Sequence, residues 1–212
     1  MTLWRAPPRP TASMGPRNPA PHPEAPPNLR TRPLPVRSAR GPWIRLHVCD
    51  RSARFFGKTG LHRFDAPAGE YGILYAGEDD FCAFVEAFGD PLDARVVSQS
   101  DLRQHCLSTV IANRLLHLVD LTAQGLSQLG ADGRLTTGDD YGLSQRWARA
   151  LWDHADQPDG LVYRARHDPS KESVAIFARA SPALRLRRLR RILDDQARLA
   201  QILDRYGFAL VE

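Results

Sequence analysis

Apolar and polar positions follow two different periods along this chain, and these periods distinguish strands from helices. Residues 43–48 alternate strictly and residues 72–76 form a short apolar run, so both segments are predicted to be strands. Apolar side chains recur every three to four positions over residues 81–88 and 141–155, which predicts amphipathic helices. The first helix is expected to begin at Asp79 or Asp80, either of which can cap it.

The remaining patterns extend this mixture of elements. Scattered Gly, Pro and charge predict a loop over residues 50–70. Strands and helices follow each other without a regular strand–helix–strand rhythm, so the sequence predicts an α+β fold. We expect a helix from Asp101 to about Ala112, a strand over 114–121, a helix over 121–129 closed by Gly130, strands over 160–166, 173–177 and 183–189, and a helix over 192–206.

The first 40 residues differ from the rest in composition. They contain 11 of the 17 prolines, and seven arginines stand there against one glutamate, a balance of +6. Since the whole chain carries +5, the remainder carries −1, and the basic character belongs to this segment. We therefore expect a disordered Pro/Arg-rich tail over residues 1–41 and a folded domain over residues 42–212 that includes a C-terminal helix. Nucleic-acid binding is not the default interpretation of the folded part.

Several common classes of site are not indicated. The three cysteines, Cys49, Cys82 and Cys106, are odd in number and include no CxxC pair, which argues against a disulfide framework and a zinc site. No histidine has HExxH spacing, and we expect no metal. No apolar run approaches the roughly 20 residues needed to cross a bilayer. The N-terminus lacks the apolar core of a signal peptide, so we expect a cytoplasmic protein without membrane contact.

A candidate site lies between residues 63 and 86, where an arginine, a tyrosine and a glutamate follow in order. Glu86 stands one helical step of about 100° from Val85, on the flank of the apolar stripe, where it can face a cleft. A carboxylate there can stabilise a cationic reaction centre. Arg63 can bind phosphate oxygens, as can Arg45 on the alternating strand, and Tyr75 can stack on a flat ring. Singly, each residue is more simply explained as surface or core, so their combination carries the hypothesis.

These residues resemble the RES domain, a family of NAD-degrading toxins of bacterial toxin–antitoxin pairs. The resemblance covers about residues 43–180 and includes Arg45, His62-Arg63-Phe64, the Tyr75 strand and the Ala83-Phe84 pair before Glu86. It continues in two later segments: Ser144-Gln145-Arg146-Trp147-Ala148 and Gly160-Leu161-Val162-Tyr163-Arg164-Ala165-Arg166-His167-Asp168, followed by the strand Val174-Ala175-Ile176-Phe177.

The resemblance implies a fold akin to ADP-ribosyltransferases and cleavage of the nicotinamide–ribose bond of NAD. Glu86, Arg63 and Tyr75 would be catalytic, and Arg45, Arg63, Tyr75, Tyr163 and Ser144 would bind substrate. NAD would be the substrate rather than a cofactor, with water or inorganic phosphate as acceptor. The implied partner is an Xre-like antitoxin, through which alone nucleic acid would be contacted, and the toxin can form a homo-oligomer within that complex.

One position departs from the family pattern. The family's serine follows Tyr-x on the late strand, where this chain has Ala165. The change is compatible with reduced activity, with a substitute hydroxyl from Ser144 or Ser173, or with no effect. Two other functions stay open: ADP-ribosyl transfer onto a macromolecule, and a catalytically weakened RES-fold binding protein. A nucleic-acid binder that uses the tail and the Leu184–Arg191 run is a third.

Overall fold

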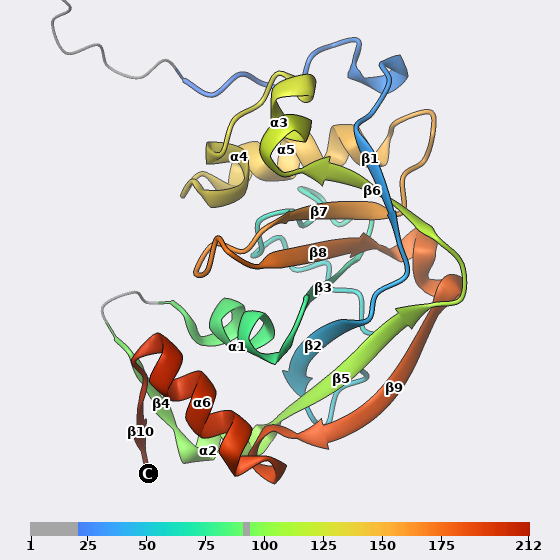
Figure 1. The fold of residues 1–212 in the computed structure, drawn as a ribbon. Helices are drawn as coiled ribbons and strands as arrows, with labels where there is room; N and C mark the ends of the chain where they lie inside the picture. The colour runs from blue at the N-terminus through green and yellow to red at the C-terminus, as the bar shows by residue number, and fades with distance from the viewer. Residues whose placement is uncertain (1–20, 91–93) are drawn as a thin grey trace, which may run out of the picture.

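The computed structural model describes residues 21–90 and 94–212, which form a large curved sheet, a small two-stranded sheet and helices around them (Figure 1). The strands are β1 (Val36–Ala39), β2 (Trp43–Val48), β3 (Ile73–Gly77), β4 (Val96–Ser98), β5 (His105–Ala112), β6 (Leu116–Leu121), β7 (Gly160–Arg164), β8 (Glu172–Phe177), β9 (Leu184–Arg191) and β10 (Ala209–Val211). The helices are α1 (Asp80–Phe88), α2 (Gln99–Gln104), α3 (Ala123–Leu129), α4 (Arg134–Thr137), α5 (Tyr141–Trp152) and α6 (Gln196–Tyr206), with 3-10 turns η1 (Leu29–Thr31), η2 (Ala178–Ala183) and η3 (Ile192–Asp194).

Eight strands form the main sheet in the order β1-β6-β7-β8-β3-β2-β5-β9. Only the β6–β7 pair in this sheet is parallel. β1 leads directly into β2 in the chain, although four other strands lie between them in the sheet. The sheet is therefore curved, so that the end of β1 comes near the start of β2 (Figure 1). The α+β prediction is confirmed.

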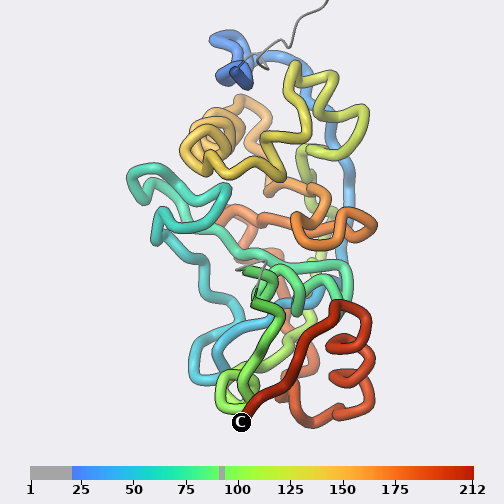
Figure 2. Tube along the Cα trace, turned by 90° about the vertical axis from the view of Figure 1, so that its left-hand side faces the viewer, coloured from blue at the N-terminus to red at the C-terminus, as the bar shows by residue number. Residues whose placement is uncertain are grey.

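Helices α3, α4 and α5 lie at one end of this sheet and α1 and α6 towards the other (Figure 1). The loop of residues 50–70 lies beside α5 (Figure 2). Gln145 on α5 fastens this loop, because its Nε2 donates to the carbonyl oxygens of Gly60 (2.8 Å) and His62 (3.0 Å). The loop that carries Arg63 is therefore held against a helix far away in sequence.

Helix α1 forms as its pattern predicts. Asp79 is the N-cap, and its side chain accepts the Cys82 N–H at 2.8 Å. Phe84 and Val85 are completely buried, and Phe84 packs against the rings of Phe88 and Phe208. This apolar stripe fixes the rotation of α1 and leaves the neighbouring flank free to face a cavity.

Two predicted boundaries are wrong. The helix expected from Asp101 to Ala112 ends at Gln104, with Ser98 as its cap, and residues 105–112 form β5. This strand lies between β2 and β9 with most side chains buried, so it shows no clean alternation. Folded structure also begins before residue 42, because β1 pairs with β6 and Leu29 is buried. Residues 1–20 of the predicted tail lie outside the described residues.

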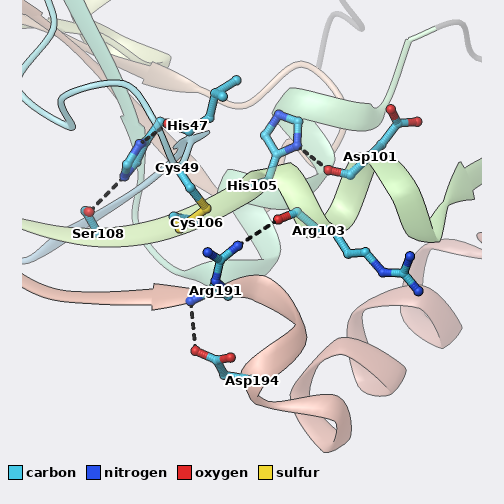
Figure 3. Close-up of a disulfide and its surroundings, with 10 residues drawn as sticks. His47, Cys49, Asp101, Arg103, His105, Cys106, Ser108, Arg191 and Asp194 are labelled. Atoms are coloured by element: carbon cyan, nitrogen blue, oxygen red, sulfur yellow. Dashed lines mark hydrogen bonds between the residues drawn. A yellow bond between two sulfur atoms is a disulfide. The ribbon is translucent and has the colours of Figure 1, made fainter.

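The expectation against a disulfide is also wrong. Cys49, just after β2, is bonded to Cys106 on β5 (Figure 3). The β2–β5 register pairs His47 with Cys106, which brings the two cysteines together, and Cys82 is left free and buried. The odd number of cysteines excluded complete pairing but not one bridge.

We predict that the α1 core contact is a main support of this part of the fold. Replacing Phe84 with alanine should lower the free energy of unfolding by about 3–5 kcal/mol, because a completely buried ring leaves a cavity. Urea unfolding followed by circular dichroism measures the loss. The half-exposed Phe55 is the matched control, for which Phe55→Ala should cost below about 0.5 kcal/mol. Equal losses for the two variants would contradict this packing.

Candidate active site

A cavity of about 300 Å³ opens where α1, β2, β3, β7 and the start of α5 meet. It contains five of the six residues predicted from the sequence as site residues. Arg45, Arg63, Tyr75, Glu86 and Tyr163 all line it, whereas Ser144 does not. The other lining residues are Ile44, Leu46, His62, Ala76, Gly77, Ala83, Ala87, Asp90, Tyr141, Arg166, His167 and Ser173.

Glu86 reaches the cavity from the flank of α1. Its Oε1 accepts the backbone N–H of His167 at 3.0 Å, which fixes the carboxylate against the turn between β7 and β8. Burial raises the pKa of Glu86, although the bond from His167 and the charge of Arg63 act in the opposite direction. A desolvated carboxylate of this kind can stabilise a positive charge that develops beside it.

Of the arginines that line the cavity, Arg45 has the fewest protein groups to offset its positive charge. Among the described residues, its guanidinium has no hydrogen-bond or ion-pair partner, and its Nη1 is completely buried. Burial lowers its pKa to about 10, so it stays charged at neutral pH. A buried charge without a counter-ion is costly, and an anionic ligand would remove that cost.

Arg63 supplies a second cation from the 50–70 loop. Its Nη1 donates to the Gly138 carbonyl oxygen at 2.6 Å, and its guanidinium lies 4.5 Å from the centre of the Tyr141 ring. Its Nη2 is buried without a protein partner among the described residues. Burial lowers the pKa of Arg63, and the nearby charge of Arg166 contributes to that lowering.

The two predicted tyrosines form part of the cavity wall. Tyr75 lies two residues before the end of β3, and its hydroxyl donates to Asp65 Oδ1 and accepts the Phe64 N–H, both at 3.0 Å. This hydroxyl therefore orders the segment next to Arg63. The ring of Tyr163 packs edge-on against Phe64 with centroids 5.0 Å apart. Burial raises the pKa of both hydroxyls far above the usual value, so both stay protonated.

The structure separates the two serines considered as substitutes at position 165. Ser144 is completely buried, and its hydroxyl donates to the Leu135 carbonyl oxygen at 2.7 Å, outside the cavity lining. Ser173 lines the cavity, and it lies opposite Tyr163 in the β7–β8 register. Its Oγ lies 3.3 Å from the Cys82 thiol, a weak partner that a ligand can displace. Ala165 is buried and does not line the cavity.

Tyr141, Arg166 and His167 are among the cavity residues that were not identified from the sequence as site residues. Tyr141 is the first residue of α5, and its hydroxyl accepts from Arg166 Nη1 at 3.1 Å. His167 is nearly buried, with Nε2 3.5 Å from Asp90 Oδ2 and Nδ1 unpartnered among the described residues. Arg166 and His167 fall within a segment that resembles the family motif, but nothing in their spacing assigned them a role. Nothing in the sequence around Tyr141 indicated that it belongs to the site.

In residues 21–90 and 94–212, no three His, Cys, Asp or Glu side chains are grouped so that they could hold a metal ion. Within these residues, no helix is long and apolar enough to cross a membrane.

Comparisons with known proteins agree with the fold. A curated relative, "Probable toxin y4kH" of Sinorhizobium fredii (strain NBRC 101917 / NGR234), is 30% identical over 112 residues, which is 53% of this chain and 87% of the relative. A chain in the crystal structure of the M. tuberculosis MbcT–MbcA toxin–antitoxin complex superposes with a TM-score of 0.59 at 19% identity, over 73% of this chain and 85% of that one, and shows a shared fold. The RES domain family model matches residues 35–199. Because that match covers most of the chain, this protein belongs to the RES domain family.

Proposed function

We propose that this protein is a toxin that destroys NAD by cleaving its nicotinamide–ribose bond. The observation that carries the proposal is the pairing, in one cavity, of a desolvated carboxylate on Glu86 with an uncompensated guanidinium on Arg45. NAD has both complementary features, since its diphosphate is anionic and its ribose becomes cationic as nicotinamide leaves.

The reaction needs little covalent help from the protein. The bond from the ribose carbon to the pyridinium nitrogen breaks, its electron pair returns to the ring, and nicotinamide departs neutral. Glu86 stabilises the positive charge left on the ribose. Water then adds and releases a proton, giving ADP-ribose, or phosphate adds and gives the ribosyl phosphate. Arg45 and Arg63 hold the diphosphate, and Tyr75 and Tyr163 shape the wall against the sugar and base.

The relatives support the toxin part of this proposal. One is named a probable toxin, and the superposed structure is that of a toxin–antitoxin complex. We accordingly propose that a cognate antitoxin binds this protein. That the antitoxin is Xre-like and carries the DNA contacts, and that the toxin forms an oligomer within the complex, are parts of the same proposal.

The decisive experiment measures nicotinamide release from NAD by the purified chain, with and without inorganic phosphate. Glu86→Gln should lower kcat by about 100- to 1,000-fold, because it removes the charge that stabilises the ribose cation. Glu24→Gln, which changes an exposed glutamate paired with Arg146 outside the cavity, is the matched control and should keep full activity. If wild type and Glu86→Gln release nicotinamide equally slowly, the proposed function is wrong. A product covalently attached to an acceptor protein would instead indicate ADP-ribosyl transfer.

The pH profile should report the state of Glu86. Its ionised form is the active one, and its pKa is raised above the ordinary 4.5, so kcat/KM should fall as acid protonates it. We predict an acid limb of kcat/KM with a midpoint above pH 4.5, recorded only where circular dichroism shows folded protein. Glu86→Gln should lack this limb. A limb in wild type centred at or below 4.5 would contradict the prediction.

We predict that Ser173 provides the hydroxyl that position 165 lacks. Ser173→Ala should lower kcat/KM roughly 5- to 20-fold, because one hydrogen bond to the substrate is lost. Ser144→Ala should instead keep kcat/KM and lower the free energy of unfolding by about 1–3 kcal/mol, since its buried bond to Leu135 is structural. An unchanged kcat/KM in Ser173→Ala would show that this hydroxyl takes no part in the reaction.

A further inference from the structure

Tyr141 touches two of the three cavity arginines with two different parts of its side chain. The guanidinium of Arg63 lies over the ring, 4.5 Å from its centre. The hydroxyl accepts from Arg166 Nη1 at 3.1 Å. Arg63 comes from the 50–70 loop and Arg166 from the turn after β7, so a residue of α5 joins segments about 100 residues apart.

The residues just before α5 make a further contact with each of these two arginines, in both cases a hydrogen bond. Gly138 accepts from Arg63 Nη1 at 2.6 Å, and Asp139 accepts from Arg166 Nη2 at 2.8 Å. Residues 138–141 are thus a common support for both side chains. Arg166 also lies 3.5 Å from Asp90 across the cavity wall, which limits its freedom further.

Two positive charges held near each other repel, which lowers the stability of the fold unless a bound anion offsets the repulsion. Burial lowers the pKa of Arg63, and the charge of Arg166 lowers it further. Asp139 and Asp90 are largely exposed and compensate Arg166, whereas Arg63 Nη2 stays buried without a protein partner among the described residues. Two oriented guanidinium groups with a free donor match an anion that has several oxygens.

We propose that Tyr141 is a positioning residue that holds Arg63 and Arg166 as a paired cation site for the diphosphate of a nucleotide. The substrate class rests on the proposed function. Arg45 approaches the same cavity from β2 and completes the positive side of the site. Tyr141 itself acts through the arginines: its ring face is occupied by Arg63 and its hydroxyl by Arg166.

The test uses ADP-ribose as the probe, since it carries the diphosphate and binds without being cleaved at the nicotinamide bond. Tyr141→Phe keeps the ring under Arg63 and removes only the hydroxyl, so calorimetry should show Kd rising about 3- to 10-fold. Tyr141→Leu loses both contacts and should raise Kd about 10- to 50-fold. Tyr206→Phe is the matched control, because it removes a hydroxyl bonded to Asp168 outside the cavity lining, and its Kd should match wild type.

Salt separates a positioning role from simple structural damage. If Tyr141 aligns cations, the affinity difference between wild type and Tyr141→Leu should shrink as sodium chloride is raised from 50 to 500 mM, since salt screens the arginines. A difference that does not change with salt, in folded protein, would mean that Tyr141 only shapes the wall and would overturn the inference.

The outcomes also distinguish this inference from the proposed function. Wild type that binds ADP-ribose in a Tyr141-dependent manner but releases no nicotinamide would refute NAD cleavage and keep the paired cation site. Nicotinamide release by wild type together with equal Kd values for wild type and Tyr141→Leu would refute the site alone. Wild type that neither binds ADP-ribose nor releases nicotinamide would refute both.

Discussion

The close approach of α1 to the end of β3 is the contact on which the site depends. Gly77 closes β3, and a Cβ there would lie 2.8 Å from both Cβ and Sγ of Cys82 on the helix. Only glycine lets the helix lie this close to the strand. The buried stripe of Phe84 and Val85 then sets the rotation of α1, and Glu86 is directed into the cavity by the helix rather than by a flexible loop.

The charges around this carboxylate are the basis for proposing a charged ligand. Burial works against ionisation of Glu86 and of Arg45, yet the pKa of about 10 keeps Arg45 cationic at neutral pH. Arg63 and Arg166 are each held by protein oxygens, whereas Arg45 has no such partner among the described residues. Burying these charges costs electrostatic free energy, and binding of the proposed diphosphate would offset that cost.

The pairing of β7 with β8 explains why the residue at position 165 alone does not tell whether the cavity contains a serine hydroxyl. Ala165 stands where the family pattern has serine, but Tyr163 pairs with Ser173 across β7 and β8, and this second hydroxyl reaches the cavity. Ser144, the other alternative, donates to a backbone carbonyl in the core. Whether a serine hydroxyl lines the cavity therefore depends on how the strands pair, and the sequence motif alone does not show it.

Local periodicity by itself determined most elements and the α+β class, because short-range patterns report which side of an element is buried. The ordered set of Arg45, Arg63, Tyr75 and Glu86 came from the residue types in combination and from the family resemblance, and the structure brings all four to one cavity. Periodicity failed at β5, where burial on both faces removes the alternation. Only the tertiary structure decided the Cys49–Cys106 bridge, which depends on strand register, and the meeting of Tyr141 with two arginines from distant segments. These contacts join residues whose separation in sequence carries no periodic signal, so they exist only once the sheet has curved and α5 has docked.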